Sequence, residues 1–328
     1  MELTPDFDLS PFNTLGLASK ARYGAVISAR DEIGELMAFA ASAGLPLHIV
    51  GGGSNLVLRD DLEAVVGVMA IKGRTIERRD DGSALVTAKA GEDWSQFVAW
   101  TVSEGLRGLE NLAGIPGTVG AAPIQNIGAY GVELAERLES LTVLDTQDGK
   151  ERRFTPDECK FSYRQSLFKQ LRGRFIVTEA TFALPRAWAP VLTYPGLDSL
   201  PRDADASVIM ERVLTLRASK LPDWRVIGNV GSFFHNPVVR PEMADAITGG
   251  PRYPQPDGTV KLSAAWLIDA CGLKGHRHGQ AGIYEGHALI VVNHGGATYR
   301  EVSELSAKVS GAVEERFGVT LTREPIEL

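Results

Sequence analysis

The sequence predicts a two-domain protein that combines helices and strands. The chain has 328 residues, and because domains usually contain about 150 residues, this length fits two of them. Short β-rich runs alternate with amphipathic helical patterns in the first half, and a proline-containing connection at residues 185–201 precedes the last third. We therefore expect a first domain over residues 1–190 and a second over residues 200–328.

Hydrophobic periodicity places the elements of the first domain. A helix is predicted at residues 31–43, where apolar residues recur at helical spacing up to Gly44, and another at residues 94–104, which Gly105 closes. The run at residues 161–169 alternates apolar and polar residues, which is typical of a strand. Clusters of β-branched and apolar residues predict further strands at 22–27, 47–50, 64–71, 85–88, 141–144 and 175–184.

The remaining part of the chain contains fewer regular elements. Residues 221–286 are rich in loop-forming residues, and a buried strand is predicted at 288–293. A short strand, VTL, is expected directly before Glu324. A helix after the 185–201 connection is expected to bury Val208, Ile209, Val213 and Leu216. A second amphipathic helix, capped by Gly318, is expected to bury Val302, Leu305, Val309, Ala312, Val313 and Phe317.

Charge and cysteine content narrow the classes of function. Lysine and arginine number 34 against 41 aspartates and glutamates, a net charge of −7, which argues against binding to nucleic acid or to an anionic membrane. Any anionic substrate must then be held by a local basic pocket. The acidic N-terminus lacks the apolar segment of a signal peptide, so we expect a cytoplasmic protein. Cys159 and Cys271 are expected to be free thiols.

Two glycine-rich segments indicate a nucleotide site. GGGSN at residues 51–55 follows a predicted strand, and its backbone amides could surround a phosphate. A longer stretch, residues 112–133, contains many glycines and shows no periodicity. Neither segment has the spacing of a Rossmann fingerprint or of a P-loop. A single glycine run is often only a tight turn, but two of them favour an extended dinucleotide, which needs backbone contacts along its length.

Polar residues that could carry chemistry are scattered along the chain. Ser232 lies in GNVGSFFHNP, but GxSxG is absent and no Ser-His-Asp set can be assembled, so a proton donor is the remaining chemical role for it. Arg164 and Glu324 would, taken singly, be solvated surface charges. The six histidines show no metal-binding spacing, so no metal site is expected.

In their order, the motifs GGGSN, GIPGTVGAAPIQNIGAYG, YRQS, KLPDW, GSFFHNP and LTREP resemble the UDP-N-acetylenolpyruvoylglucosamine reductase (MurB) family. The resemblance extends from about Asn13 to Glu324. Members of this family are flavoenzymes of peptidoglycan precursor synthesis. The resemblance implies an α+β fold: an FAD-binding domain of the PCMH type, like that of vanillyl-alcohol oxidase, with two subdomains, followed by a C-terminal α+β substrate-binding domain.

The resemblance also implies roles for individual residues. Ser232 matches the general acid, and Arg164 and Glu324 match the pair that polarises the substrate carboxylate. FAD is the implied cofactor and NADPH the co-substrate. Residues that match substrate-side positions are Tyr163, Tyr194, Lys220, Asn236 and His287. Residues expected to bind FAD are Gly51, Gly52, Gly53, Ser54, Asn55, Gly114, Ile115, Pro116, Gly117, Val119, Gly120, Asn126, Ile127, Gly128, Ala129, Tyr130 and Gly131.

The implied reaction reduces UDP-GlcNAc-enolpyruvate to UDP-N-acetylmuramate, and Tyr194 places the chain in the subgroup that keeps a substrate-covering tyrosine loop. His235 stands where the family commonly has lysine, so a charge there would depend on pH. We expect a monomer that binds neither nucleic acid nor membranes. Two other functions fit the glycine-rich segments: an FAD oxidase of the vanillyl-alcohol-oxidase type that acts on an alcohol or lactone, and a nucleotide-binding protein without catalysis.

Overall fold

The computed structural model describes residues 1–328, which form two compact units. The first unit comprises Met1–Phe7, Ala21–Gly52 and Glu63–Arg217, and the second comprises Asp8–Lys20, Gly53–Leu62 and Ala218–Leu328. These units do not coincide with the division at residues 190–200, which stays a prediction. Helix α4 (Ala206–Lys220) accounts for part of the difference, because its Ile209 and Val213 are buried in the core of the first unit. The segments Asp8–Lys20 and Gly53–Leu62, which belong to the second unit, account for the rest.

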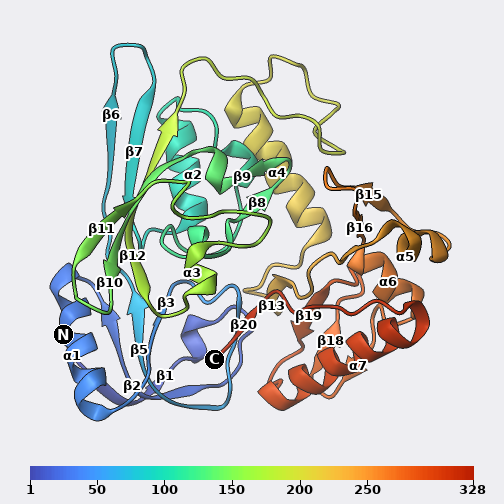
Figure 1. Cartoon of the computed structure of the whole chain (residues 1–328), viewed down its shortest axis with the longest axis horizontal. Helices are drawn as coiled ribbons and strands as arrows, with labels where there is room; N and C mark the ends of the chain where they lie inside the picture. Colours follow the sequence, from blue (N-terminus) through green and yellow to red (C-terminus); the bar gives the residue numbers. More distant parts are fainter. The chain divides into compact units, whose positions relative to one another are not determined.

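The first unit contains two larger sheets, visible in Figure 1. One has the strand order β1-β2-β5-β3, with β3 parallel to β5; the other is antiparallel in the order β11-β10-β12-β7-β6. The strands are β1 (Thr4–Asp8), β2 (Lys20–Ile27), β3 (Leu47–Val50), β5 (Asp61–Met69), β6 (Arg74–Arg78), β7 (Ala84–Lys89), β10 (Leu138–Asp145), β11 (Glu151–Phe154) and β12 (Phe175–Leu184).

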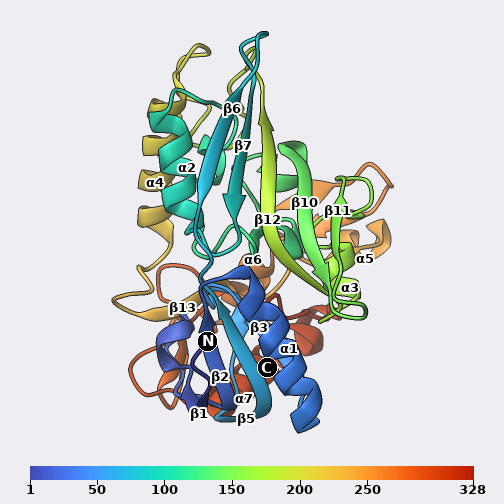
Figure 2. The same cartoon turned by 90° about the vertical axis from the view of Figure 1, so that its left-hand side faces the viewer.

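Helix α1 (Arg30–Ala43) covers the sheet that contains β2 and β5 (Figure 2). It buries Ile33, Leu36 and Ala40, and it ends at Gly44, whose φ of 65° is left-handed. The left-handed conformation is inexpensive for glycine and satisfies the last carbonyls of the helix. The predicted helix at residues 31–43 is thus confirmed. The strands β1, β6 and β11, short and mostly exposed, carried no clear pattern in the sequence.

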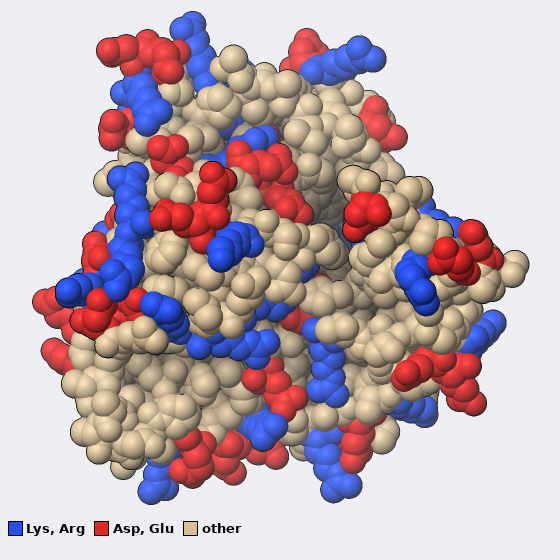
Figure 3. All heavy atoms as spheres, viewed as in Figure 1, with Lys and Arg blue, Asp and Glu red and all other residues tan.

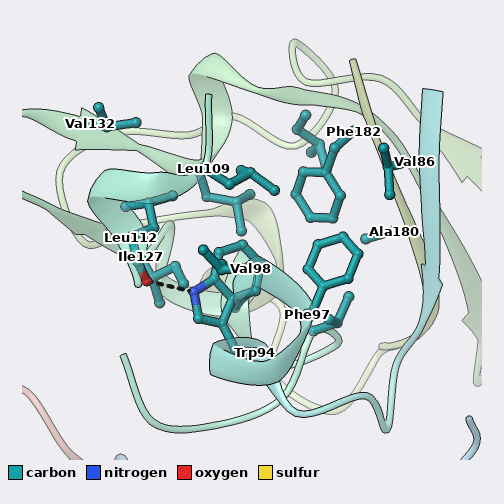
Figure 4. Close-up of a cluster of buried hydrophobic side chains, with 14 of the residues drawn as sticks. Val86, Trp94, Phe97, Val98, Leu109, Leu112, Ile127, Val132, Ala180 and Phe182 are labelled. Carbon is teal, nitrogen blue, oxygen red and sulfur yellow. Dashed lines mark hydrogen bonds between the residues drawn. The ribbon is translucent and has the colours of Figure 1, made fainter. Parts of the chain in front are cut away.

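Helix α2 (Trp94–Ser103) packs against the five-stranded sheet in an aromatic core (Figure 4). The rings of Trp94 and Phe97 lie 5.8 and 5.4 Å from the ring of Phe182 on β12. The Trp94 indole N–H donates to the carbonyl of Leu112 at 2.9 Å. The core therefore fixes the position at which the glycine-rich stretch begins.

The glycine-rich stretch itself contains only short elements, as predicted. The short elements of the first unit are η2 (Glu110–Leu112), η3 (Ala122–Gln125), β8 (Gly128–Ala129), β9 (Val132–Glu133), η4 (Leu134–Glu136) and α3 (Leu167–Gln170). The predicted strand at residues 161–169 is wrong. Ser162 and Gln165 close a tight turn through two backbone hydrogen bonds, and Ser166 caps α3 by accepting from the amide of Lys169 at 3.2 Å.

The second unit has three small sheets, with strand orders β13-β19-β18-β17, β14-β16-β15 and β20-β4. Its longest helix, α7 (Tyr299–Phe317), begins at Thr298, which forms a capping box with Glu301, and ends at Gly318. The other elements are η1 (Ser10–Phe12), β4 (Leu56–Val57), β13 (Gly228–Ser232), β14 (Val238–Val239), α5 (Pro241–Ala246), β15 (Arg252–Pro254), β16 (Val260–Leu262), α6 (Ala264–Ala270), β17 (Arg277–His278), β18 (Ala281–Ile283), β19 (Ile290–Asn293) and β20 (Ile326–Glu327).

Two details of the sequence prediction for this region are corrected. Val208 is 43% exposed, whereas the buried face of α4 contains Ala206, Ile209 and Val213, which follow the helical period. The segment VTL before Glu324 is not a strand; the terminal strand is β20, which lies after Glu324 and pairs in parallel with β4.

The charged side chains are interspersed over the face shown in Figure 3, with both signs present in each region of that face. None of the helices combines the length and the apolar content needed to cross a lipid bilayer.

Both cysteines are free, as the sequence predicted, and they differ in exposure. Cys159 is fully buried, and burial raises the pKa of its thiol to about 12, so at pH 8 it stays protonated. Cys271 is only partly buried. We expect a thiol reagent at pH 8 to label Cys271 in the native protein and Cys159 only after denaturation. Peptide mass spectrometry tests this, and equal labelling rates in the native state would contradict it.

Candidate active site

The first part of the site is a close approach of two glycine-rich segments within the first unit. The chain leaves β3 at Gly51, where an added Cβ would overlap Thr118 Oγ1. A Cβ at Gly52 would lie 3.0 Å from the Cα of Gly117. Only glycine allows two backbones to come this close. Within the first unit, the structure therefore brings the first two glycines of GGGSN against Gly117 and Thr118.

Backbone hydrogen bonds hold residues 114–131, the predicted cofactor wall, in place. Gly117 O accepts from Trp94 N at 3.0 Å, and Gly120 N donates to Ala90 O at 2.9 Å. Between them, the Thr118 hydroxyl oxygen is buried and has no hydrogen-bond partner in the chain. Since buried polar atoms are nearly always paired, this oxygen marks a place where a ligand atom would complete the site.

The end of the glycine-rich stretch forms a β-hairpin that presents an aromatic side chain. Strands β8 and β9 are joined by Tyr130 and Gly131, which both have positive φ, 52° and 85°, as a type I′ turn requires. The Tyr130 ring packs edge-on against Tyr194 with 4.7 Å between ring centroids. The Asn111 amide donates to the carbonyls of Tyr130 and Val191, at 2.8 and 2.9 Å, and so links this hairpin to the segment that carries Tyr194.

Arg164 is attached to the same hairpin. It occupies a left-handed position with φ of 55° in the turn after Ser162, an uncommon conformation for a residue with a side chain. Its Nη2 donates to the carbonyl of Gly128 at 3.1 Å, and its guanidinium lies 5.4 Å from the centre of the Tyr163 ring. The turn therefore directs a permanent cation to the edge of the predicted cofactor wall.

In the second unit, a β-bulge positions Ser232. The pairing of β13 with β19 shifts register between Asn229 and Ser232, and Gly231 within the bulge has a φ of 69°. The Gly231 amide donates to Asn229 Oδ1 at 3.1 Å. Phe233 and Phe234 follow and are buried in the core. Bulges commonly redirect a side chain near an active site, and here one fixes the hydroxyl between a strand end and two anchored aromatic rings.

Glu324 lies beside the end of this strand. Its amide donates to the carbonyl of Phe233 at 2.9 Å, and the residue is only 8% exposed. Its carboxylate oxygen Oε2 lies 3.5 Å from Nδ1 of His235, which is buried without a hydrogen bond. The Asn55 amide donates to the backbone carbonyl of Glu324 at 3.4 Å. The second unit thus brings together Ser232, Glu324 and the end of GGGSN.

The remaining polar candidates of the second unit form a second group. Burial lowers the pKa of His287, and the nearby cations Lys220 and Lys274 lower it further, so the imidazole is neutral at pH 7. Its Nδ1 accepts from Leu289 N at 3.2 Å, which leaves the proton on Nε2. Asn236 Oδ1 accepts from Ala264 N at 3.0 Å and caps the start of α6.

Most predicted site residues therefore fall into two sets, one in each unit. Arg164 belongs to the first, whereas Ser232 and Glu324 belong to the second, and the meeting of all three stays a prediction. Asn126, expected to bind cofactor, has a structural role, because its amide bonds Glu133 and the carbonyl of Ser162 and its Oδ1 accepts from Ala135 N.

Comparisons with known proteins match segments of both units. Residues 25–155 match the family model "FAD binding domain", and residues 222–327 match "UDP-N-acetylenolpyruvoylglucosamine reductase, C-terminal domain". The chain is 45% identical to the UDP-N-acetylenolpyruvoylglucosamine reductase of Burkholderia vietnamiensis, over 99% of this chain and 97% of the relative. The chain belongs to the UDP-N-acetylenolpyruvoylglucosamine reductase family.

Other members of the family confirm the fold. The reductase of Azoarcus is 44% identical over 99% of this chain and 98% of its own length. The crystal structure of the MurB protein from Thermus caldophilus matches with a TM-score of 0.69 at 26% identity, and it covers 99% of this chain and 98% of that one. The α+β fold with an FAD-binding domain and a C-terminal reductase domain, predicted from the motifs, is therefore confirmed.

The residues present in this MurB-family protein fit FAD. The pyrophosphate of a dinucleotide needs a narrow channel lined by backbone amides, and Gly51, Gly52 and Gly117 provide a channel that any Cβ would fill. The buried, unpartnered hydroxyl of Thr118 offers a further hydrogen bond at that channel. Thr118, Asn111 and His235 were absent from the predicted site. Thr118 lies inside the glycine-rich stretch, and His235 follows Ser232 by three positions. Their closeness in sequence to these motifs was the signal that could have identified them.

Proposed function

We propose that this protein is an FAD-dependent enzyme that uses NADPH to reduce UDP-GlcNAc-enolpyruvate to UDP-N-acetylmuramate. The observation that carries the proposal is the 45% identity to a UDP-N-acetylenolpyruvoylglucosamine reductase along 99% of this chain. The glycine channel of the first unit and the Ser232–Glu324 pair of the second support it, because a reductase of this type needs both a cofactor wall and a proton donor.

Bound FAD would supply the redox chemistry, which is the relay of a hydride from NADPH to C3 of the enol ether. Negative charge then develops on C2 and on the adjacent carboxylate of the substrate. We assign Arg164 to stabilise that charge, since its guanidinium matches a carboxylate in geometry and stays charged at every physiological pH. Its bond to the Gly128 carbonyl orients the guanidinium before the substrate arrives.

Ser232 completes the reaction by donating a proton to C2. A serine hydroxyl is a weak acid, but the carbanionic centre is a strong base, so close placement is sufficient. Glu324 is assigned to hydrogen-bond the substrate carboxylate, which requires that it carry a proton or share one. Its mostly buried position supports this assignment, because a buried carboxyl group needs polar partners, and His235 Nδ1 lies 3.5 Å from its Oε2.

Residues around these three are assigned to bind the rest of the substrate. Lys220 supplies a cation for a phosphate, and the neutral His287 can donate a hydrogen bond from Nε2. Asn236 has its amide N–H groups available on the side opposite the bond to Ala264. Tyr163 and Tyr194 are assigned to cover the bound substrate, and Tyr194 lies against Tyr130 of the predicted cofactor wall.

We also infer the setting in which the enzyme works. The net charge of −7 supports a protein that binds neither anionic membranes nor nucleic acid, and a cytoplasmic location is proposed. A monomer is proposed. Its product enters cell-wall synthesis, which places the enzyme among the proteins needed for cell shape and division.

Flavin turnover tests the proposed function directly. Purified protein is expected to be yellow, to bleach under anaerobic conditions when NADPH is added, and to regain its colour when UDP-GlcNAc-enolpyruvate follows. Reoxidation by O₂ should be much slower. A vanillyl-alcohol-oxidase-type oxidase would instead reoxidise rapidly with O₂ and ignore the enolpyruvyl sugar. Colourless protein that takes up no FAD would contradict both functions.

A further inference from the structure

The segment that carries Tyr194 forms no helix or strand, yet two adjacent residues hold it to the core of the first unit. These residues are Glu110 and Asn111 of η2, which are 1% and 0% exposed. Glu110 Oε1 accepts from the indole N–H of Trp188 at 3.0 Å, and Glu110 Oε2 accepts from Gly108 N at 2.6 Å. The carboxyl group thus attaches the start of the segment to the turn before η2.

Asn111 forms a second attachment, and it reaches the predicted cofactor wall as well. Its amide donates to the carbonyl of Val191 at 2.9 Å and to that of Tyr130 at 2.8 Å. Its Oδ1 is buried and has no hydrogen-bond partner, so the two donated bonds hold the side chain in place. One buried amide therefore joins the segment to the hairpin of β8 and β9.

Prolines stiffen the chain between these attachments and Tyr194. The sequence PRAWAPVLTYP at residues 185–195 has a proline at every fifth position. Each proline fixes its own φ and restricts the residue before it. Trp188, Val191 and Tyr194 are spaced by three residues, which is the period of polyproline II and places them on one side of an extended backbone. A shift at either attachment is therefore transmitted to the tyrosine.

Close packing on the hairpin and a buried leucine fix the segment further. A Cβ at Gly131 would lie 3.1 Å from Val191 Cγ1 and 3.2 Å from Thr193 Oγ1. On the other side of Tyr194, Leu197 is fully buried, and its amide donates to the Tyr194 carbonyl at 2.9 Å. The Tyr194 side chain itself is 36% exposed. The tyrosine thus lies between fixed points and still presents part of its ring to solvent.

We propose that Glu110 and Asn111 are positioning residues that preset Tyr194 beside the cofactor wall before the substrate arrives. Residues 188–194 act as a stiff arm, which η2 binds at its base and which carries at its end the phenol assigned to the substrate. Affinity falls with the fraction of protein in the binding-competent conformation, so an arm that is already in place raises affinity without touching the ligand. The inference rests on the proposed function for the substrate that Tyr194 covers.

Asn111→Leu tests this role, because leucine has the same branched shape as asparagine and donates no hydrogen bond. In the holoenzyme without substrate, the amides of residues 189–196 should exchange with deuterium about tenfold faster than in wild type. KM for UDP-GlcNAc-enolpyruvate should rise about tenfold, while kcat and the rate of reduction by NADPH stay within about twofold. Trp188→Phe, which removes only the bond to Glu110, should give smaller changes in the same direction and provides the test if Asn111→Leu does not fold.

Thr146→Val is the matched control. The Thr146 hydroxyl, like the Asn111 amide, donates to two backbone carbonyls, those of Gly173 and Arg174, both at 3.0 Å. This residue directly follows β10 and has no hydrogen bond to η2 or to the arm. The control should leave KM and the exchange of residues 189–196 as they are in wild type. Equal changes in the control and in Asn111→Leu would show a general loss of stability and would overturn the proposal.

A double-mutant cycle with Tyr194→Ala decides whether Asn111 acts through the tyrosine. If it does, Asn111→Leu adds no further rise in KM to that of Tyr194→Ala. Additive effects, or a wild-type KM in Tyr194→Ala, would overturn the proposal, as would unchanged exchange at residues 189–196. Failure of the wild-type protein to reduce the enolpyruvyl sugar would instead contradict the proposed function. The exchange measurement uses no substrate, so it would still decide whether the two residues hold the arm.

Discussion

Replacing Ser232 with alanine is expected to slow reoxidation of the reduced flavin by UDP-GlcNAc-enolpyruvate by roughly 10²–10⁴-fold, which is the usual contribution of one proton donor. Reduction of the flavin by NADPH should keep nearly its wild-type rate, because no proton passes to C2 in that half-reaction. Stopped-flow absorbance under anaerobic conditions measures the two half-reactions separately.

The control for this variant is Ser42→Ala. Ser42 is exposed on α1, and its hydroxyl bonds only the carbonyl of Phe39 in the same helix. Both half-reactions should be unchanged in the control. If Ser232→Ala slowed the two half-reactions to the same degree, the hydroxyl would be supporting the fold or the binding of the cofactor. Its role as proton donor would then be rejected.

Replacing Arg164 with methionine should lower kcat of the second half-reaction by about 10²–10³-fold, comparable to the loss of one donor from an oxyanion hole. The effect should exceed any rise in KM, because charge on the substrate carboxylate and C2 is greatest in the transition state. Arg164→Lys should be faster than Arg164→Met and slower than wild type. Lysine restores the positive charge but not the planar guanidinium that can bind a carboxylate through two hydrogen bonds. Stopped-flow rates at varied substrate concentration measure both parameters.

FAD content is the check on this second variant. Arg164 also bonds the Gly128 carbonyl, so its loss could disturb the predicted cofactor wall. We expect the variant to retain FAD with a normal spectrum and a normal rate of reduction by NADPH. A loss of FAD, or a kcat equal to wild type with only KM raised, would contradict transition-state stabilisation by Arg164.

Much of the fold could be predicted because local signals agreed with the final packing. Helix α1 and helix α7 have apolar residues at helical spacing and a left-handed glycine, Gly44 or Gly318, directly after their last residue. The structure of both helices depends on neighbours in the sequence. The glycine-rich stretch was recognised as irregular because no period fits it, but its course depends on hydrogen bonds with Trp94 and Ala90.

The failures concern residues whose conformation depends on distant contacts. The alternation at residues 161–169 matches a strand, but the bond from Arg164 to Gly128 and the cap formed by Ser166 stabilise a turn and a short helix. Val208 is apolar and yet exposed, because the neighbours of α4 cover only the Ile209 side. The bulge before Ser232 and the contact between His235 and Glu324 arise from strand pairing across a long separation in the sequence, which spacing alone does not encode.

The pairing of β20 with β4 has a consequence for how the protein is made. Ile326 N donates to Asn55 O at 2.9 Å, so the loop that begins the predicted flavin site is anchored by residues that come much later in the sequence. During synthesis, residues 51–55 leave the ribosome well before residues 326–327, so this anchor is missing until the later residues follow. Contacts of such high sequence separation form late. Stable capture of the yellow cofactor should therefore wait until residues 326–327 have been made and have paired with β4.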